Sequence, residues 1–99
     1  MDERAMGLLE AAYRASEWKQ KEGRRLLLTQ LDGDVADAAG LFPTPRDTPK
    51  GRMHRAVVDS LLESGAVTMP DIREQQVLGE FYEITAIGVE MLRNAGRIT

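Results

Sequence analysis

The sequence from Thr48 to Gly65 predicts one long helix that ends directly before a strand. Thr48 suits the N-cap, and Pro49 suits the first helical position, where a missing N–H costs nothing. The run to Ser64 has an apolar face that can hold it on a core, and Gly65 suits a helix end. This face consists of Val57, Val58, Leu61 and Leu62.

Two short strands and a last helix are predicted after this run. The strands cover Ala66–Met69 and Gly79–Ile84, and the polar residues 71 to 76 form the tip between them. Thr85 suits the N-cap of a helix over Ala86–Ala95, and Gly96 suits its end. The second half of the chain is therefore expected to run helix, strand, strand, helix.

The first half of the chain predicts three further helices. The first covers residues 2 to 22, and a second, short one covers Arg24–Leu31, which is rich in leucine. A third covers Val35–Ala39, with Asp34 as its N-cap and Gly40 at its end. Residues 42 to 49 contain three prolines and cannot be helical throughout.

Trp18 does not fit the predicted first helix. On a straight helix it points away from the apolar stripe of Ala5, Leu9 and Ala12 and lies among charged side chains. Either the helix bends or Trp18 folds over a neighbouring element, or Trp18 contacts a second subunit together with Tyr13.

Composition excludes several classes of protein. Ninety-nine residues fit one domain, and no apolar run approaches the length that spans a bilayer. The charged N-terminus is unlike a signal peptide, so we expect a cytoplasmic protein. No cysteine is present, and the single histidine, His54, has no second ligand of its kind. We therefore expect no metal, no cofactor and no enzymatic activity, with His54 as a hydrogen-bonded packing residue.

Charge is distributed unevenly along this acidic chain. The net charge is −3, yet residues 43 to 55 contain four cationic side chains and one acid, Asp47. Residues 56 to 92 contain seven acids and a single cation, Arg73. Such a division predicts a focused positive surface on an acidic body, which suits contact with a polyanion.

Three segments resemble parts of known DNA-binding proteins. Residues 33 to 41 resemble the first helix of a helix-turn-helix, and residues 61 to 67 resemble the end of a winged-helix recognition helix. Residues 82 to 88 resemble the strand-to-helix step of PadR-like and MarR-like regulators. The resemblance implies a mainly α fold with a small β-hairpin wing (α+β). It also implies a winged-helix core over residues 24 to 95, with an extra N-terminal helix.

This resemblance implies sequence-specific binding of double-stranded DNA by a small transcriptional regulator, acting as a homodimer. The recognition helix, about residues 49 to 64, would enter the major groove, and the wing, about residues 70 to 79, would contact the backbone or minor groove. The expected DNA-binding residues are Arg46, Thr48, Lys50, Gly51, Arg52, Arg55, Arg73, Gln75 and Gln76.

Three other interpretations remain open at this point. The cations that begin the long helix are solvated surface charges in the plainest of them. A winged helix can also serve as an adaptor or inhibitor that binds proteins and not DNA, which the acidic total favours. A small-molecule sensor ranks last, because the chain has little beyond the core from which to build a pocket.

Overall fold

The computed structural model describes residues 2–21, 23–41, 48–70 and 81–98, and it has an α+β fold. Within these ranges are the helices α1 (Glu3–Ala15), α2 (Gly33–Ala38), α3 (Pro49–Glu63) and α5 (Ala86–Asn94). The strands are β1 (Glu17–Lys21), β2 (Arg24–Thr29), β3 (Val67–Thr68) and β4 (Tyr82–Ile84). The predicted α+β class is thus confirmed, with more sheet than a single hairpin.

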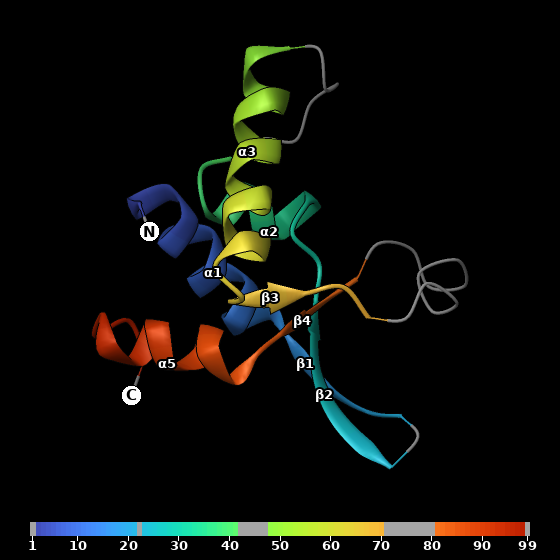
Figure 1. The fold of residues 1–99 in the computed structure, drawn as a ribbon. Coiled ribbons are helices and arrows are strands. Elements are labelled where there is room, and N and C mark those ends of the chain that lie inside the picture. Colours follow the sequence, from blue (N-terminus) through green and yellow to red (C-terminus); the bar gives the residue numbers. More distant parts are fainter. Residues whose placement is uncertain (1, 22, 42–47, 71–80, 99) are drawn as a thin grey trace.

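One antiparallel sheet contains all four described strands, in the order β1-β2-β4-β3. β1 and β2 form a hairpin that turns at Gly23, whose φ of 77° suits glycine. Only the last residues of β2, Leu28 and Thr29, pair with β4. The turn end of the β1–β2 hairpin, beyond this pairing, extends away from the body (Figure 1).

The predicted helix over residues 2 to 22 is wrong beyond residue 15. α1 ends at Ala15, and Ser16 caps it in an extended conformation. The next five residues form β1, so Trp18 lies on a strand and not on the back of a helix. The apolar stripe of the helix is correct, and Leu8 joins its buried residues.

The predicted helix over Arg24–Leu31 is also wrong, because this segment forms β2. Leu26, Leu27 and Leu28 are all buried although successive side chains of a strand point to opposite faces, so both faces of β2 are covered here. The helix predicted over Val35–Ala39 is present as α2, but it begins two residues earlier, so its N-cap is Asp32 and not Asp34. The side chain of Asp32 makes no capping hydrogen bond.

The predictions for the second half of the chain are confirmed closely. Thr48 Oγ1 accepts a hydrogen bond of 3.1 Å from the Gly51 amide and so caps α3. Thr85 caps α5 in the same way, through the amide of Gly88. Gly65 follows α3 with φ 80°. β3 and the described part of β4 are shorter than predicted.

A single apolar core joins the helices to the sheet. α1 lies at its centre and packs against α2, α3, α5 and β2. The largest side chains enclosed in it come from α1, α3, β3 and α5: Leu8, Leu9, Val58, Leu61, Val67 and Leu92. Among the described residues no buried side-chain nitrogen or oxygen lacks a hydrogen-bond partner.

The end of the chain returns to its beginning. Arg97, beyond α5, forms ion pairs with Glu3 and Glu10 of α1. The hydrogen bond to Glu3 is the largest cause that raises the pKa of Arg97. This group of three side chains, the α1 clasp, holds the last residues of the described chain against α1.

None of the helices in the described ranges is long and apolar enough to cross a membrane.

Candidate nucleic-acid interface

Helix α3 is fixed to the core mainly through its second half. Val57, Val58 and Leu61 are buried, and each such side chain contributes about 1.5–3 kcal/mol by leaving water. In the first half, Met53 packs partly against the core. Figure 1 shows the N-terminal turns of α3 extending beyond the sheet and the other helices.

His54 holds the first half of α3 to the chain that precedes α2. Its Nε2 lies 2.6 Å from the carbonyl oxygen of Leu31, and the side chain is partly buried. At this distance the ring donates a hydrogen bond to the carbonyl, which requires the proton on Nε2. The expectation of a hydrogen-bonded packing residue agrees with this geometry.

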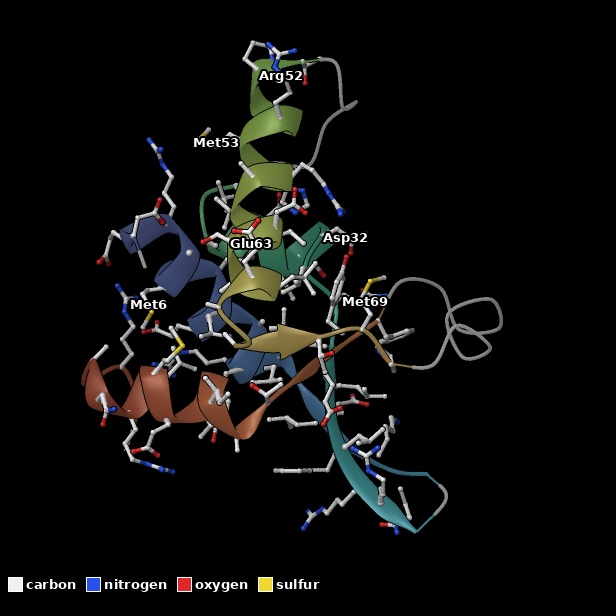
Figure 2. All side chains as sticks on the ribbon, viewed as in Figure 1. Met6, Asp32, Arg52, Met53, Glu63 and Met69 are labelled. Carbon is white, nitrogen blue, oxygen red and sulfur yellow. The ribbon has the colours of Figure 1, made fainter. Side chains whose placement is uncertain are left out.

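The face of α3 opposite its buried residues carries the described cations of this helix. Arg52, Arg55, Ala56 and Asp59 follow one another at spacings of three, one and three residues, so they share a helix face. Arg52 and Ala56 are exposed, and the other two are partly exposed. Figure 2 shows Arg52 at the outer end of α3, pointing away from the rest of the molecule.

Arg55 forms an ion pair with Asp59 of the same helix. Its Nη2 lies 3.0 Å from Oδ1 of Asp59, one turn later. The arginine side chain is 43% exposed and the aspartate 48%, so water screens the pair, which contributes at most about 1 kcal/mol. A phosphate or a base edge can therefore compete with Asp59 for Arg55.

Of the nine predicted DNA-binding residues, the structure brings four together at the start of α3: Thr48, Gly51, Arg52 and Arg55. Thr48 and Gly51 form the cap, and Gly51 is buried. The backbone of Lys50 lies in the same turn, whereas its side chain is outside the described part. Arg46, Arg73, Gln75 and Gln76 also lie outside the described residues.

The two residues predicted to contact a second subunit lie on different elements. Tyr13 is on α1 and packs in part against the core. Trp18 is on β1 and is 55% exposed. The guanidinium of Arg25 in β2 lies 4.5 Å from the centre of the indole ring. The single helix predicted to carry both residues is therefore absent from the described chain.

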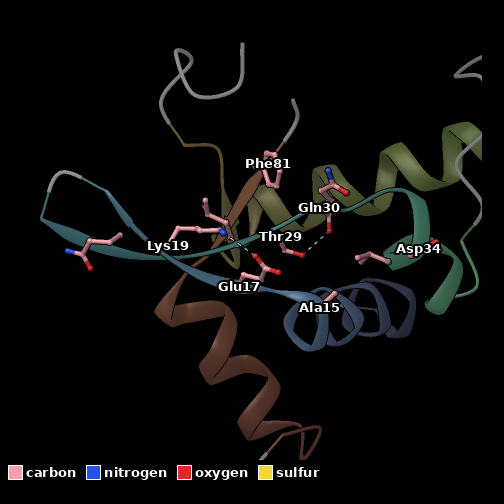
Figure 3. A pocket seen from close by; sticks show the side chains of 10 residues that line it. Ala15, Glu17, Lys19, Thr29, Gln30, Asp34 and Phe81 are labelled. Atoms are coloured by element: carbon pink, nitrogen blue, oxygen red, sulfur yellow. Dashed lines mark hydrogen bonds and ion pairs between the residues drawn. The ribbon is translucent and has the colours of Figure 1, made fainter. Parts of the chain in front are cut away.

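A surface that sequence reasoning missed is a cavity of about 670 Å³ beside β1 and β2 (Figure 3). The residues that line it include the apolar Leu28, Val35 and Phe81 and the charged Glu17 and Lys19 of β1. It was missed because β1 was predicted as helix. In the described ranges, no group of three or more histidine or acidic side chains could hold a metal ion.

Comparisons with protein-family models, with curated proteins and with solved structures find no match to this chain.

Proposed function

We propose that this protein is a winged-helix regulator that binds double-stranded DNA through the N-terminal end of α3. The order of elements supports the fold: α2 and α3 follow one another, the strands β3 and β4 come next, and α5 closes the series. β2 precedes α2 and pairs with β4, which gives this unit a sheet of three strands. β1 lies outside this three-stranded unit and adds a fourth strand beside β2.

The single observation that carries the proposal is the position of Arg52 and Arg55. Both lie in the first two turns of a helix that is anchored by buried Val57, Val58 and Leu61 and whose N-terminal turns extend from the body. A helix held in this way can enter the major groove, which is wide enough for one helix. Its first turns then reach the base edges, as in other helix-turn-helix proteins.

Arginine side chains at this place have a specific chemical use. A guanidinium donates two parallel hydrogen bonds to O6 and N7 of guanine, which is worth about 1–3 kcal/mol against another base. Lys50, in the same turn, is assigned to a phosphate, a contact that sets register and not sequence. Arg46 and the wing residues Arg73, Gln75 and Gln76 are assigned to backbone or minor-groove contacts.

Selection from a random pool of duplex DNA tests the proposal, followed by affinity measurements on the selected sequence. We expect Arg52→Ala and Arg55→Ala to weaken specific binding by about 1–3 kcal/mol each. The matched control is Arg93→Ala, because Arg93 is also an exposed helical arginine and lies 3.1 Å from the acid Glu90. This variant should bind like the unchanged protein.

Salt dependence provides a second criterion. Binding to phosphates releases counterions, so affinity should fall steeply as salt rises. Equal affinity of the double variant Arg52→Ala/Arg55→Ala and the unchanged protein would contradict the assignment of α3. Enrichment of no sequence from the pool, at low salt, would reject sequence-specific DNA binding itself and favour the interpretation as a protein-binding adaptor.

A further inference from the structure

The β1–β2 hairpin lies far from the surface proposed to bind DNA. Figure 1 shows its turn and the N-terminal end of α3 at opposite ends of the molecule, whose longest extent is 41 Å. A duplex held in its major groove by α3 therefore leaves the hairpin open to a different partner. Its outer strand, β1, is not needed to complete the sheet of β2, β4 and β3.

One edge of the hairpin is open. β1 is the last of the described strands at its side of the sheet and pairs only with β2, in a register that joins Glu17 to Leu28 and Lys21 to Arg24. Its outer backbone N–H and C=O groups thus have no strand partner in the described chain. An edge of five residues is about 16 Å long, enough for an extended peptide to add as a further strand.

The two faces of β1 offer different contacts to such a peptide. Trp18 faces the same side as Leu27 and Arg25, and its indole is more than half exposed beneath the guanidinium. Exposed tryptophan and arginine are the side chains that dominate binding energy at protein interfaces. The other face, which carries Glu17 and Lys19, borders the cavity of about 670 Å³ (Figure 3).

The net positive charge of the hairpin favours an acidic peptide. Residues 17 to 29 contain four cations and two acids, on a chain whose net charge is −3. Arg24 and Arg25 are next to the turn and are exposed. Lys19 pairs with Glu17 at 3.2 Å, but both side chains are mostly exposed, so another carboxylate can replace this contact at little cost.

We propose that the open edge of β1 binds an extended acidic segment of a partner protein by strand addition. A large apolar side chain of the segment occupies the cavity between β1, α2 and Phe81. Its carboxylates lie toward the hairpin turn, beside Lys19 and Arg25. Backbone hydrogen bonds supply affinity, and the cavity and the cations supply selectivity. This site is independent of α3 and of the proposed DNA binding.

A phage-displayed library of random nonapeptides, selected on the full chain, tests this site. We expect enriched sequences to combine several acids with one large apolar residue. The most enriched peptide, once synthesised, should shift the emission of Trp18, which is the only tryptophan in the chain. Lys19→Glu/Arg25→Glu should weaken its binding at least about tenfold, because like charges then face each other.

Matched controls are Arg14→Glu and Arg93→Glu, exposed arginines of α1 and α5 that also lie near acids. They should leave peptide affinity within about twofold. Circular dichroism checks that each variant is folded, and Lys19→Glu alone replaces the double variant if that one is not. Enrichment of basic peptides, of no peptide, or of peptides that bind the folded variant unchanged would overturn the proposal.

Two further outcomes would overturn it in favour of another occupant. A doubled mass in light scattering, together with a concentration-dependent shift of Trp18 emission in the absence of peptide, would assign the edge to a second copy. Loss of DNA affinity in Lys19→Glu/Arg25→Glu would assign the hairpin to nucleic acid. Neither result depends on Arg52 or Arg55, so failure here is distinguishable from failure of the proposed function.

Discussion

Gly88 lies against the backbone of the chain that joins α3 to β3, and its replacement should destabilise the protein. A Cβ atom at this position would lie 2.3 Å from the carbonyl oxygen of Ala66, whereas real Cβ atoms essentially never come within 3.0 Å. The obstacle is backbone, which Thr85 also fixes: its Oγ1 lies 2.5 Å from the carbonyl oxygen of Gly65 and 3.0 Å from that of Ala66. The first turn of α5 must therefore move as a unit.

The expected cost of Gly88→Ala follows from this geometry. Forcing an extra carbon against rigid backbone costs about 2–3 kcal/mol, and the gain in helix propensity returns about 1 kcal/mol, so the net loss is about 1–2 kcal/mol. Since 1 kcal/mol shifts Tm by about 4–8 °C in a domain of this size, we expect Tm to fall by roughly 5–15 °C. Thermal and urea unfolding followed by circular dichroism measure both quantities.

Gly7→Ala is the matched control, because the same substitution in α1 meets nothing within 4 Å. Gly7 lies inside the helix, so alanine should stabilise the protein by about 0.5–1 kcal/mol. The two variants should therefore change the free energy of unfolding in opposite directions, although both replace a helical glycine by alanine. A Gly88→Ala protein as stable as the unchanged one would refute the packing of α5 against the chain that joins α3 to β3.

Three further predictions concern single polar side chains. Thr85→Val removes the cap of α5 and should lower the free energy of unfolding by about 1–2 kcal/mol in urea titrations. Thr29→Val should cost about 1–3 kcal/mol in the same assay, because the hydroxyl of buried Thr29 is the donor shared by the carbonyl oxygens of Ala12, at 3.1 Å, and Gln30, at 2.9 Å. Asp59→Asn frees Arg55 and should tighten binding of selected DNA by up to about fivefold at low salt, with a smaller gain at high salt, as measured by fluorescence anisotropy. Weaker binding of Asp59→Asn would contradict a role for Arg55 at the DNA.

The helices α3 and α5 were predictable because their signals are local. Thr48 and Thr85 cap their own helices, and Gly65 ends α3 in a conformation that glycine adopts without strain. Each signal acts within four residues along the chain. Pattern reasoning therefore found the beginning of both helices without knowledge of the fold.

The strands β1 and β2 were not predictable in this way, because they depend on contacts distant in sequence. β2 is a short leucine-rich run with both faces covered, and such a run has no alternation to distinguish it from a helix. β1 is polar, and Glu17 and Lys21 are also spaced as a helical ion pair. One signal was present: Trp18 did not fit the helix, because the helix had already ended.

The candidate site was predictable only in part. The cations at the start of α3 follow from the cap and the apolar face, which together fix where each side chain points. The pairing of Arg55 with Asp59 is also a local signal, because the two residues are four positions apart on one helix. The cavity beside β1 could not be predicted, because it exists only once β1 is a strand.

The α1 clasp has a consequence for protein engineering. Arg97 and Glu3 are 94 positions apart in sequence but in direct contact, so a few added residues can join the two ends of this chain. New termini opened in the β1–β2 turn, at Gly23, would then give a circular permutant whose core elements keep their order in space. In that permutant β2 is the first strand and β1 is the last. β1 can then be removed by simple truncation of the chain, with the rest of the protein left intact.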